Sequence, residues 1–229
     1  MIVARSPTAE RLVEHIVAVS QQRRTIVALD GPVAVGKSTL AAQLARRLET
    51  LGLRTCVVGA DGFLLPMAKL RAQGLIARKG FPESFDRPAM LAFLAAFLCG
   101  DGPGFPTYAH DLYDVSPDCR MNTDDAALVL FEGVNVLAPD LTQFYDFTLY
   151  LDADLSDLEN WFTARFMATP FSSARAEALA PWRPASGDLA RWAAAVWREV
   201  NVRNLVEHIS KGRDRADIVL VAHSDHGLD

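Results

Sequence analysis

The chain has 229 residues, half of them hydrophobic, which is enough for one α/β domain with a sizeable buried core. Its 28 acidic and 23 basic side chains give a formal net charge of −5, and no long Lys/Arg run offsets it. This balance argues against nucleic acid as the main partner, because a phosphate-binding surface normally shows as a basic stripe.

Cysteine usage and hydropathy bear on the compartment. Cys56, Cys99 and Cys119 are odd in number and share no metal-ligand spacing, which indicates reduced thiols in a cytosolic protein. Residues 1–14 hold no apolar run suited to a signal peptide, and no stretch approaches the roughly 20 apolar residues of a membrane span. We therefore expect a soluble, cytoplasmic protein without a membrane partner.

Apolar spacing predicts helices and strands in alternation. The first half is expected to contain a helix over 9–20, a strand over 25–29, a helix over 37–51, a strand over 55–58 and a helix over 87–98. The second half is expected to contain strands over 128–131 and 147–151, helices over 155–168 and 188–209, and a last strand over 218–221. Residues 65–84 and 100–106 are rich in Gly and Pro and are expected to be loops.

This alternation is typical of a parallel sheet covered on both faces, so we expect an α/β fold with three layers. The whole chain, 1–229, is expected to form one domain. Its core would span about 25–229, and a helical lid with the acceptor region would span about 155–209.

A phosphate-binding loop is the strongest motif. Residues 31–38, G-P-V-A-V-G-K-S, fit G-x-x-x-x-G-K-[ST] and lie between a predicted strand and a predicted helix. The motif predicts a P-loop NTPase fold with ATP and Mg²⁺, in which Lys37 bridges the β- and γ-phosphates and Ser38 binds the metal. The nucleotide-binding candidates are Gly31, Val33, Ala34, Val35, Gly36, Lys37, Ser38 and Thr39.

The loop alone leaves water, a nucleotide or a metabolite as the phosphoryl acceptor, although no N-K-x-D guanine-specificity run is present. Acids at the strand ends bear on this choice, because ligands collect at the carboxyl ends of parallel strands. Asp61 could accept the proton of an attacking alcohol or help to hold Mg²⁺, and Glu132 could hold the metal or its waters. The alternatives are that Asp61 caps a turn at Gly62 and that Glu132 is an ordinary strand-end acid.

Four short runs carry a family resemblance: D-G-F at 61–63, K-G-F-P-E-S-F-D at 79–86, Y-A-H-D-L-Y-D at 108–114 and E-G-V-N at 132–135. With them the chain resembles the type I (bacterial) pantothenate kinase, which is grouped with uridine kinase and phosphoribulokinase. The second and third runs are specific, whereas the other two are shared more widely in the group. The likeness extends from about Thr25 to the C-terminus and is interrupted over 171–187.

The resemblance implies a kinase that transfers the γ-phosphoryl of Mg-ATP to a hydroxyl of a small metabolite. Asp61 would be the catalytic carboxylate, Lys37 and Arg165 would neutralise the phosphoryl oxygens, and Ser38 with Asp61 or Glu132 would hold Mg²⁺. The candidate acceptor contacts are Tyr108, His110, Tyr113, Phe162 and Asn204, and His226 is the candidate for packing on adenine.

The residues themselves support some of these roles and leave others open. Arg165 on a predicted lid helix could offset developing charge, or it could be an ordinary solvated arginine. His110 between two tyrosines indicates a ligand contact more than a structural histidine. One helical stripe indicates either a pocket wall or helix packing, and it consists of Trp197, Asn201, Asn204 and His208.

The chain departs from the family pattern where the acceptor would bind. Phe162 stands where the family has a tyrosine, and residues 171–187 differ from the family's acceptor lid. Ala42 replaces a basic residue tied to feedback binding of coenzyme A, so such inhibition is expected to be weak or absent. The longer N-terminal extension that contributes to dimer contacts in the family is missing, so a homodimer stays open as an option.

Pantothenate is the leading acceptor, followed by a sugar such as fructose and then by a nucleoside. Shorter relatives named as fructose transport system kinases have a similar length and make the sugar a serious competitor. A non-catalytic NTP-binding regulatory protein is the alternative from another class, and the tyrosine and histidine run counts against it. A nucleic-acid end kinase is disfavoured by the acidic balance.

Overall fold

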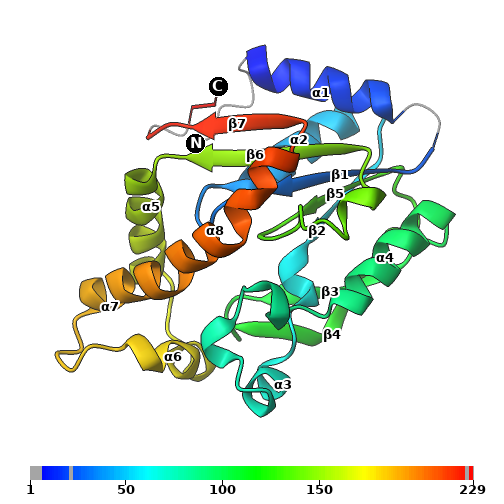
Figure 1. Cartoon of the computed structure of the whole chain (residues 1–229). Helices are drawn as coiled ribbons and strands as arrows, with labels where there is room; N and C mark the ends of the chain where they lie inside the picture. The colour runs from blue at the N-terminus through cyan, green and yellow to red at the C-terminus, as the bar shows by residue number, and fades with distance from the viewer. Residues whose placement is uncertain (1–6, 21–22, 225–226, 229) are drawn as a thin grey trace.

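The computed structural model describes residues 7–20, 23–224 and 227–228 of the chain (Figure 1). His226, the candidate for packing on adenine, lies outside the described residues. None of the helices in the described ranges is long and apolar enough to cross a membrane.

A five-stranded sheet forms the centre of the molecule, in the order β2-β5-β1-β6-β7 (Figure 1). Its strands are β1 (Thr25–Asp30), β2 (Thr55–Gly59), β5 (Leu128–Glu132), β6 (Phe147–Ala153) and β7 (Ile218–Ala222). All of its pairings are parallel, and β1 in the middle is buried along its whole length. Parallel pairing brings the carboxyl ends of all these strands to one edge, where the phosphate loop also begins.

Helices cover both faces of the sheet. The described helices are α1 (Pro7–Val19), α2 (Lys37–Thr50), α3 (Met67–Ala72), α4 (Arg87–Cys99), α5 (Leu155–Ala168), α6 (Ser173–Leu179), α7 (Leu189–Val196) and α8 (Arg203–Glu207). Val27 and Leu29 of β1 belong to a core shared with α1, α2, α5 and α7. Ile26 and Ala28 point the other way, into a core shared with α4. The three-layer α/β fold predicted from the sequence is confirmed.

Residues 65–84 were expected to be a loop, and this expectation was wrong. They contain α3 and two short 3₁₀ turns, Ile76–Arg78 and Pro82–Ser84. Met67 and Leu70 of α3 are buried against Ala178 of α6, about a hundred residues further along the chain. Because a short helix of this kind depends on that distant contact, the local sequence pattern does not predict it.

A second correction concerns the Gly/Pro stretch 100–106. Part of it belongs to strand β3 (Gly104–Ala109), which pairs antiparallel with β4 (Asp114–Asn122) in a separate two-stranded sheet. The register shifts between Pro106 and Thr107, and such irregularities are where a strand accommodates proline. The tyrosine and histidine run therefore lies on a β-hairpin.

The predicted helix over 188–209 is interrupted. After α7, residues Trp197–Val202 form a π-helical turn, followed by α8 and a 3₁₀ segment, Ile209–Arg215. A π turn inserts an extra residue per turn, so side chains beyond it leave the stripe that α-helical spacing predicts. Residues 171–187 contain α6, which begins with Ser172 as its N-cap.

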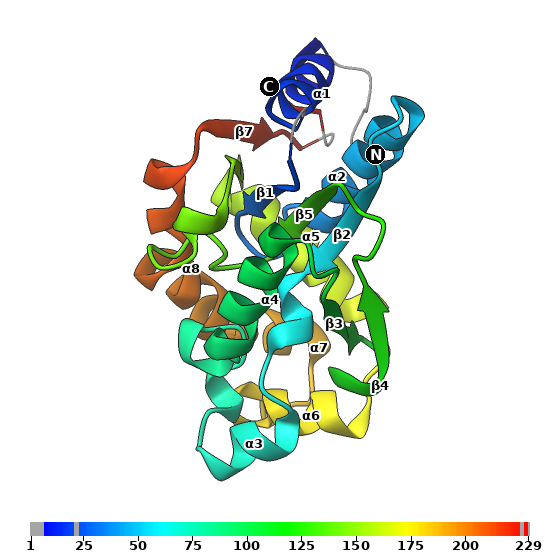
Figure 2. The same cartoon turned by 90° about the vertical axis from the view of Figure 1, so that its right-hand side faces the viewer.

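In both views α3, α6 and the β3–β4 hairpin gather at one end of the molecule, beyond the sheet (Figures 1 and 2). A hydrogen bond from the backbone N–H of Met67 to the carboxylate of Asp114, 3.0 Å long, ties α3 to the hairpin. This end of the fold lies next to Asp61, because the turn that carries Asp61 packs on β3.

The close approach of that turn to β3 generates a testable prediction. A Cβ added at Gly62 would lie 2.1 Å from the carbonyl oxygen of Pro106, so Gly62→Ala must push the two segments apart. We expect it to lower the free energy of unfolding by about 1–3 kcal/mol in urea denaturation. Gly59→Ala is the matched control, since its nearest new contact is an ordinary 3.6 Å. Equal stability of the two variants would contradict the packing described.

Candidate active site

The phosphate loop follows β1 and wraps as the motif requires. Gly31 has φ 147°, and a Cβ there would lie 2.2 Å from the carbonyl oxygen of Leu151, so only glycine fits. Gly36, with φ 101°, is the N-cap of α2, and Ala34 also has a positive φ of 71°. Alternation of positive and ordinary φ values along a loop allows its N–H groups to turn toward one point, which is how such loops bind anions.

Lys37 and Ser38, the first residues of α2, differ in their surroundings. The Lys37 ammonium is buried and donates hydrogen bonds to the carbonyl oxygens of Gly31 (2.8 Å) and Pro32 (2.7 Å). Ser38 is exposed, and its hydroxyl donates to Oε1 of Glu132 at 2.8 Å. The loop and the end of β5 thus present a hydroxyl and a carboxylate side by side.

Four charged groups share this edge of the sheet. Burial lowers the pKa of Lys37, and the nearby carboxylates of Glu132 and Asp61 oppose that shift. Burial raises the pKa of Glu132, while Lys37 and the Ser38 hydroxyl hold it down. Partial burial lowers the pKa of Arg165, and Asp61 opposes that lowering too. The electrostatic coupling of Asp61 with all three indicates that the predicted catalytic residues are close together.

Arg165 is the fourth charged group, and it interacts electrostatically with Asp61. It lies in the last turn of α5 on the exposed side of the helix. Phe162, one turn earlier, points into the core instead, where its ring packs on Phe166 (5.7 Å between centroids) and Trp197 (5.5 Å). The sequence grouped Arg165 and Phe162 at the site, whereas in the structure the Phe162 ring packs in the hydrophobic core.

A lysine that the site prediction omitted lies beside Tyr108 and Tyr113. Lys79, from the K-G-F run, donates a hydrogen bond to the carbonyl oxygen of Tyr113, and its ammonium lies 4.2 Å and 5.0 Å from the ring centres of Tyr113 and Tyr108. Burial lowers the pKa of Lys79 to about 8, against the opposing influence of Asp114 and Asp61. Its place in a family-specific run was the signal in the sequence.

The two tyrosines and the histidine of the hairpin come together as expected. Tyr108 on β3 packs edge-on against His110 (5.1 Å between centroids) and Tyr113 (6.4 Å). Burial raises the pKa of Tyr108 and of Tyr113, and the Asp61 carboxylate raises both pKa values further. His110 is exposed at the hairpin turn, so it stands at the rim of this aromatic group.

Asn204 is buried among polar partners. It is 3% exposed, donates to the carbonyl oxygen of Gly80 at 2.8 Å, and accepts from the amide of Asn135 at 3.3 Å. Asn135 also donates to Gly80, so the two amides hold the backbone next to Lys79. His208 packs its ring on Phe81 at 5.9 Å, which favours the helix-packing alternative for that residue.

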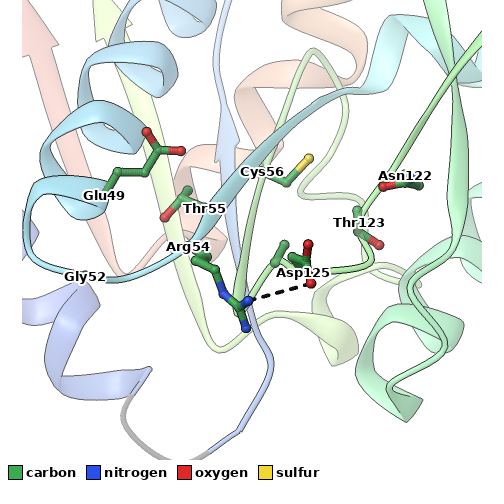
Figure 3. Close-up of a pocket in the computed structure, with 9 residues that line it drawn as sticks. Glu49, Gly52, Arg54, Thr55, Cys56, Asn122, Thr123 and Asp125 are labelled. Carbon is green, nitrogen blue, oxygen red and sulfur yellow. Dashed lines mark ion pairs between the residues drawn. The ribbon is translucent and has the colours of Figure 1, made fainter.

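A separate hollow of about 350 Å³ lies at the amino ends of β2 and β5, opposite the phosphate loop (Figure 3). The Arg54–Asp125 ion pair, 3.6 Å, crosses it, and both side chains are mostly exposed. Exposed pairs of this kind add little stability. Because Asp61 and Glu132 follow the other ends of these strands, the hollow is not part of the candidate site.

No protein-family model matches the chain, but its relatives are informative. The pantothenate kinase of Streptococcus pneumoniae serotype 19F (strain G54) is 34% identical over 232 residues, covering 92% of this chain and 72% of the relative. The pantothenate kinase of Streptomyces coelicolor is 36% identical over 218 residues, covering 88% of this chain and 66% of the relative. The chain belongs to the pantothenate kinase family.

Solved structures agree with this assignment. A protein of Silicibacter sp. TM1040 assigned as a fructose transport system kinase has a TM-score of 0.65 and 28% identity, over 81% of this chain and 92% of that one. Two others share the fold alone: phosphoribulokinase from Rhodobacter spheroides (TM-score 0.63, 12% identity, 87% and 70% covered) and a protein of Bacillus stearothermophilus assigned as a uridine kinase (0.59, 19%, 92% and 95%). The predicted class, a small-molecule kinase of the P-loop type, is confirmed.

Asp30 is a structural acid of this pantothenate kinase family member that the site prediction did not include. It is 1% exposed and accepts hydrogen bonds from the backbone N–H of Gly31 (2.7 Å) and Leu137 (2.8 Å). Burial raises its pKa to about 6, although these N–H groups and Lys37 favour the charged form. Asp30 therefore joins the start of the phosphate loop to the loop that follows Glu132.

The raised pKa of Asp30 makes stability depend on pH. Because its folded pKa of about 6 lies above the ordinary 3.8, ionisation disfavours the folded state. Stability should fall as pH rises from about 4 through about 6, by a contribution on the order of 3 kcal/mol, and level off above that range. Urea denaturation from pH 4 to 7 should show this dependence flattened in Asp30→Asn relative to the wild type.

Asp101→Asn, at an exposed carboxylate, is the control and should keep the wild-type pH profile. Asparagine places an amide against a backbone N–H, so Asp30→Asn is expected to be less stable at low pH, where the protonated acid fits best. An unchanged pH profile in Asp30→Asn would contradict the assignment.

Proposed function

We propose that this protein transfers the γ-phosphoryl group of ATP to a hydroxyl of pantothenate. One observation carries the proposal: two groups of side chains meet at the carboxyl edge of the sheet. The first consists of Lys37, Glu132 and Asp61 beside the phosphate loop. The second consists of Lys79 and the rings of Tyr108 and Tyr113. The Asp61 carboxylate also affects the pKa of Lys79. Asp61 lies where a donor phosphate and an acceptor hydroxyl would come together.

The phosphate loop would hold ATP through its inward N–H groups and the N-terminus of α2. Lys37 would exchange its carbonyl partners for the β- and γ-phosphate oxygens. Ser38 and Glu132 fit Mg²⁺, because a hydroxyl and a carboxylate 2.8 Å apart are hard oxygen ligands beside the phosphates. The metal, when bound, would neutralise charge on the phosphates.

Asp61 would orient the acceptor hydroxyl and take its proton as the new bond to phosphorus forms. Arg165 would donate to the phosphoryl oxygens from the lid and offset the charge that they develop. The influence of Asp61 on the pKa of Arg165 supports this pairing across the site.

Charge complementarity favours pantothenate among the acceptors. Pantothenate carries a carboxylate, whereas fructose and uridine are uncharged. The partly buried ammonium of Lys79, held by Tyr113 and lying over two aromatic rings, would attract such an anion. A neutral acceptor would leave this charge without a partner from the substrate.

A sugar acceptor is the second candidate. It is favoured by the likeness to the Silicibacter protein, at 28% identity.

The test of the proposed reaction is ADP release with Mg²⁺-ATP and, in turn, pantothenate, fructose, uridine or no acceptor. We expect pantothenate alone to stimulate release, and Asp61→Asn to lower the stimulated rate at least about a hundredfold, as loss of a general base does. Asp125→Asn, at the opposite end of the sheet, should match the wild type.

Each other outcome is informative. Stimulation by fructose or uridine alone would keep the phosphoryl transfer and replace the acceptor. No stimulation by any acceptor, with Asp61→Asn equal to the wild type, would overturn the kinase mechanism and favour an NTP-binding regulatory protein.

A second prediction concerns the pH dependence of acceptor binding. Because the pKa of Lys79 is lowered to about 8, its positive charge is present below pH 8 and lost above it. The KM for pantothenate should therefore rise as pH passes about 8 in the wild type. In Lys79→Arg the charge persists at higher pH, so this rise should disappear. Lys69→Arg, on the exposed face of α3, is the control and should keep the wild-type profile. A wild-type KM that stays level well above pH 8 would argue against a role for Lys79 in acceptor recognition.

A further inference from the structure

Arg175 is a buried arginine in the segment where this chain departs from its family. It lies in the first turn of α6 and is 5% exposed. Its guanidinium donates to the carbonyl oxygens of Phe166 (3.0 Å), Pro170 (3.3 Å) and Thr169. These carbonyls lie at and just beyond the C-terminus of α5, where backbone carbonyls have no partner within the helix. A cation at this end also complements the helix dipole.

Aromatic rings fix the plane of the same guanidinium. Its central carbon lies 4.7 Å from the ring centre of Phe166 and 4.1 Å from that of Phe171. Within residues 7–20, 23–224 and 227–228, the hydrogen bonds of Arg175 all go to carbonyl oxygens, and it forms no ion pair with an acid. A flat group with several donors suits this position, because the single ammonium nitrogen of a lysine cannot occupy both places from which Nη1 and Nη2 donate.

A short hydrogen-bond chain connects Arg175 to Arg165. Thr169 donates to the carbonyl oxygen of Arg165 from both its backbone N–H (3.0 Å) and its hydroxyl (2.8 Å). The carbonyl of Thr169 in turn accepts from Arg175. The turn of α5 that carries Arg165 is thus closed by Thr169 and held by Arg175.

The helix from which Arg175 projects is itself anchored. Arg71 of α3 makes a bidentate pair with Glu177 of α6, at 2.9 Å and 2.7 Å. Ala178 is buried with Leu70, and the indole of Trp192 donates to the carbonyl of Leu179 at 2.9 Å. Helix α6 therefore bridges α3 and α7 and gives Arg175 a fixed base (Figures 1 and 2).

We infer that Arg175 is a positioning residue for phosphoryl transfer, which holds the last turn of α5 so that Arg165 faces the transferred phosphoryl group. The inference rests on the proposed kinase function and adds a residue to it. Arg175 acts through Arg165 and does not touch the substrates. Its effect therefore falls on kcat, because misplacing a group by about 1 Å can cost about a hundredfold in rate.

A double-mutant cycle separates this role from a merely structural one. Turnover is measured for wild type, Arg175→Lys, Arg165→Ala and the double variant, with whichever acceptor the wild type uses. If it uses none, the rate of ADP release with water as acceptor takes its place. We expect Arg175→Lys to lower kcat about tenfold in the wild-type background and less than about twofold when Arg165 is already alanine.

Thr169→Val provides a second variant that removes one bond to the Arg165 carbonyl and leaves Arg175 intact. Its loss in kcat should be smaller than that of Arg175→Lys and should also vanish in the Arg165→Ala background. Arg183→Lys is the matched control, since Arg183 is an exposed lid arginine that packs on Trp192. It should leave kcat unchanged.

Three results would overturn the inference. Equal losses in both backgrounds would mean that Arg175 acts independently of Arg165. A raised KM for the acceptor with unchanged kcat would mean direct contact with the substrate. Unchanged kcat in both Arg175→Lys and Thr169→Val would remove the positioning role. Failure of the proposed function has a different signature, in which Asp61→Asn matches the wild type.

Discussion

A buried carboxylate connects the parts of this site. Asp30, at the end of the central strand, accepts N–H groups from Gly31 and Leu137, and so fixes the phosphate loop against the segment that follows Glu132. Asn135 of that segment holds the Gly80 carbonyl next to Lys79. The phosphate loop and the segment around Lys79 are therefore connected through one chain of backbone and amide contacts. Losing one of these buried hydrogen bonds would cost more free energy than losing an exposed ion pair, because a buried polar group without a partner is destabilising.

The ends of helices α5 and α6 determine the surroundings of Arg165. Arg165 lies in the last turn of α5. Arg175 of α6 donates a hydrogen bond to the backbone carbonyl of Phe166 in the same turn. The Arg71–Glu177 pair and the packing of Ala178 on Leu70 join α6 to α3, which precedes Lys79 in the chain. Segments that are far apart in sequence thus bring Lys79 and Arg165 within electrostatic range of Asp61.

The proposed acceptor follows from this distribution of charge. The positive groups converge on one edge of a chain whose net charge is −5, which suits an anionic substrate at a site built for an anionic nucleotide. Phe162 packs in the core with Trp197, so the change from the family tyrosine is compensated by apolar contacts.

The sequence by itself determined the sheet strands, the phosphate loop and the family-specific runs, because each depends on local spacing or on a fixed motif. The continuous apolar run Leu128–Phe131 and the G-x-x-x-x-G-K-S pattern need no distant partner to be recognised. Helix α3, the β3–β4 hairpin and the π turn needed the tertiary structure, since distant contacts stabilise or distort them. The same holds for the residues missed at the site: Lys79 and Arg175 acquire their surroundings only when the hairpin and α5 fold beside them.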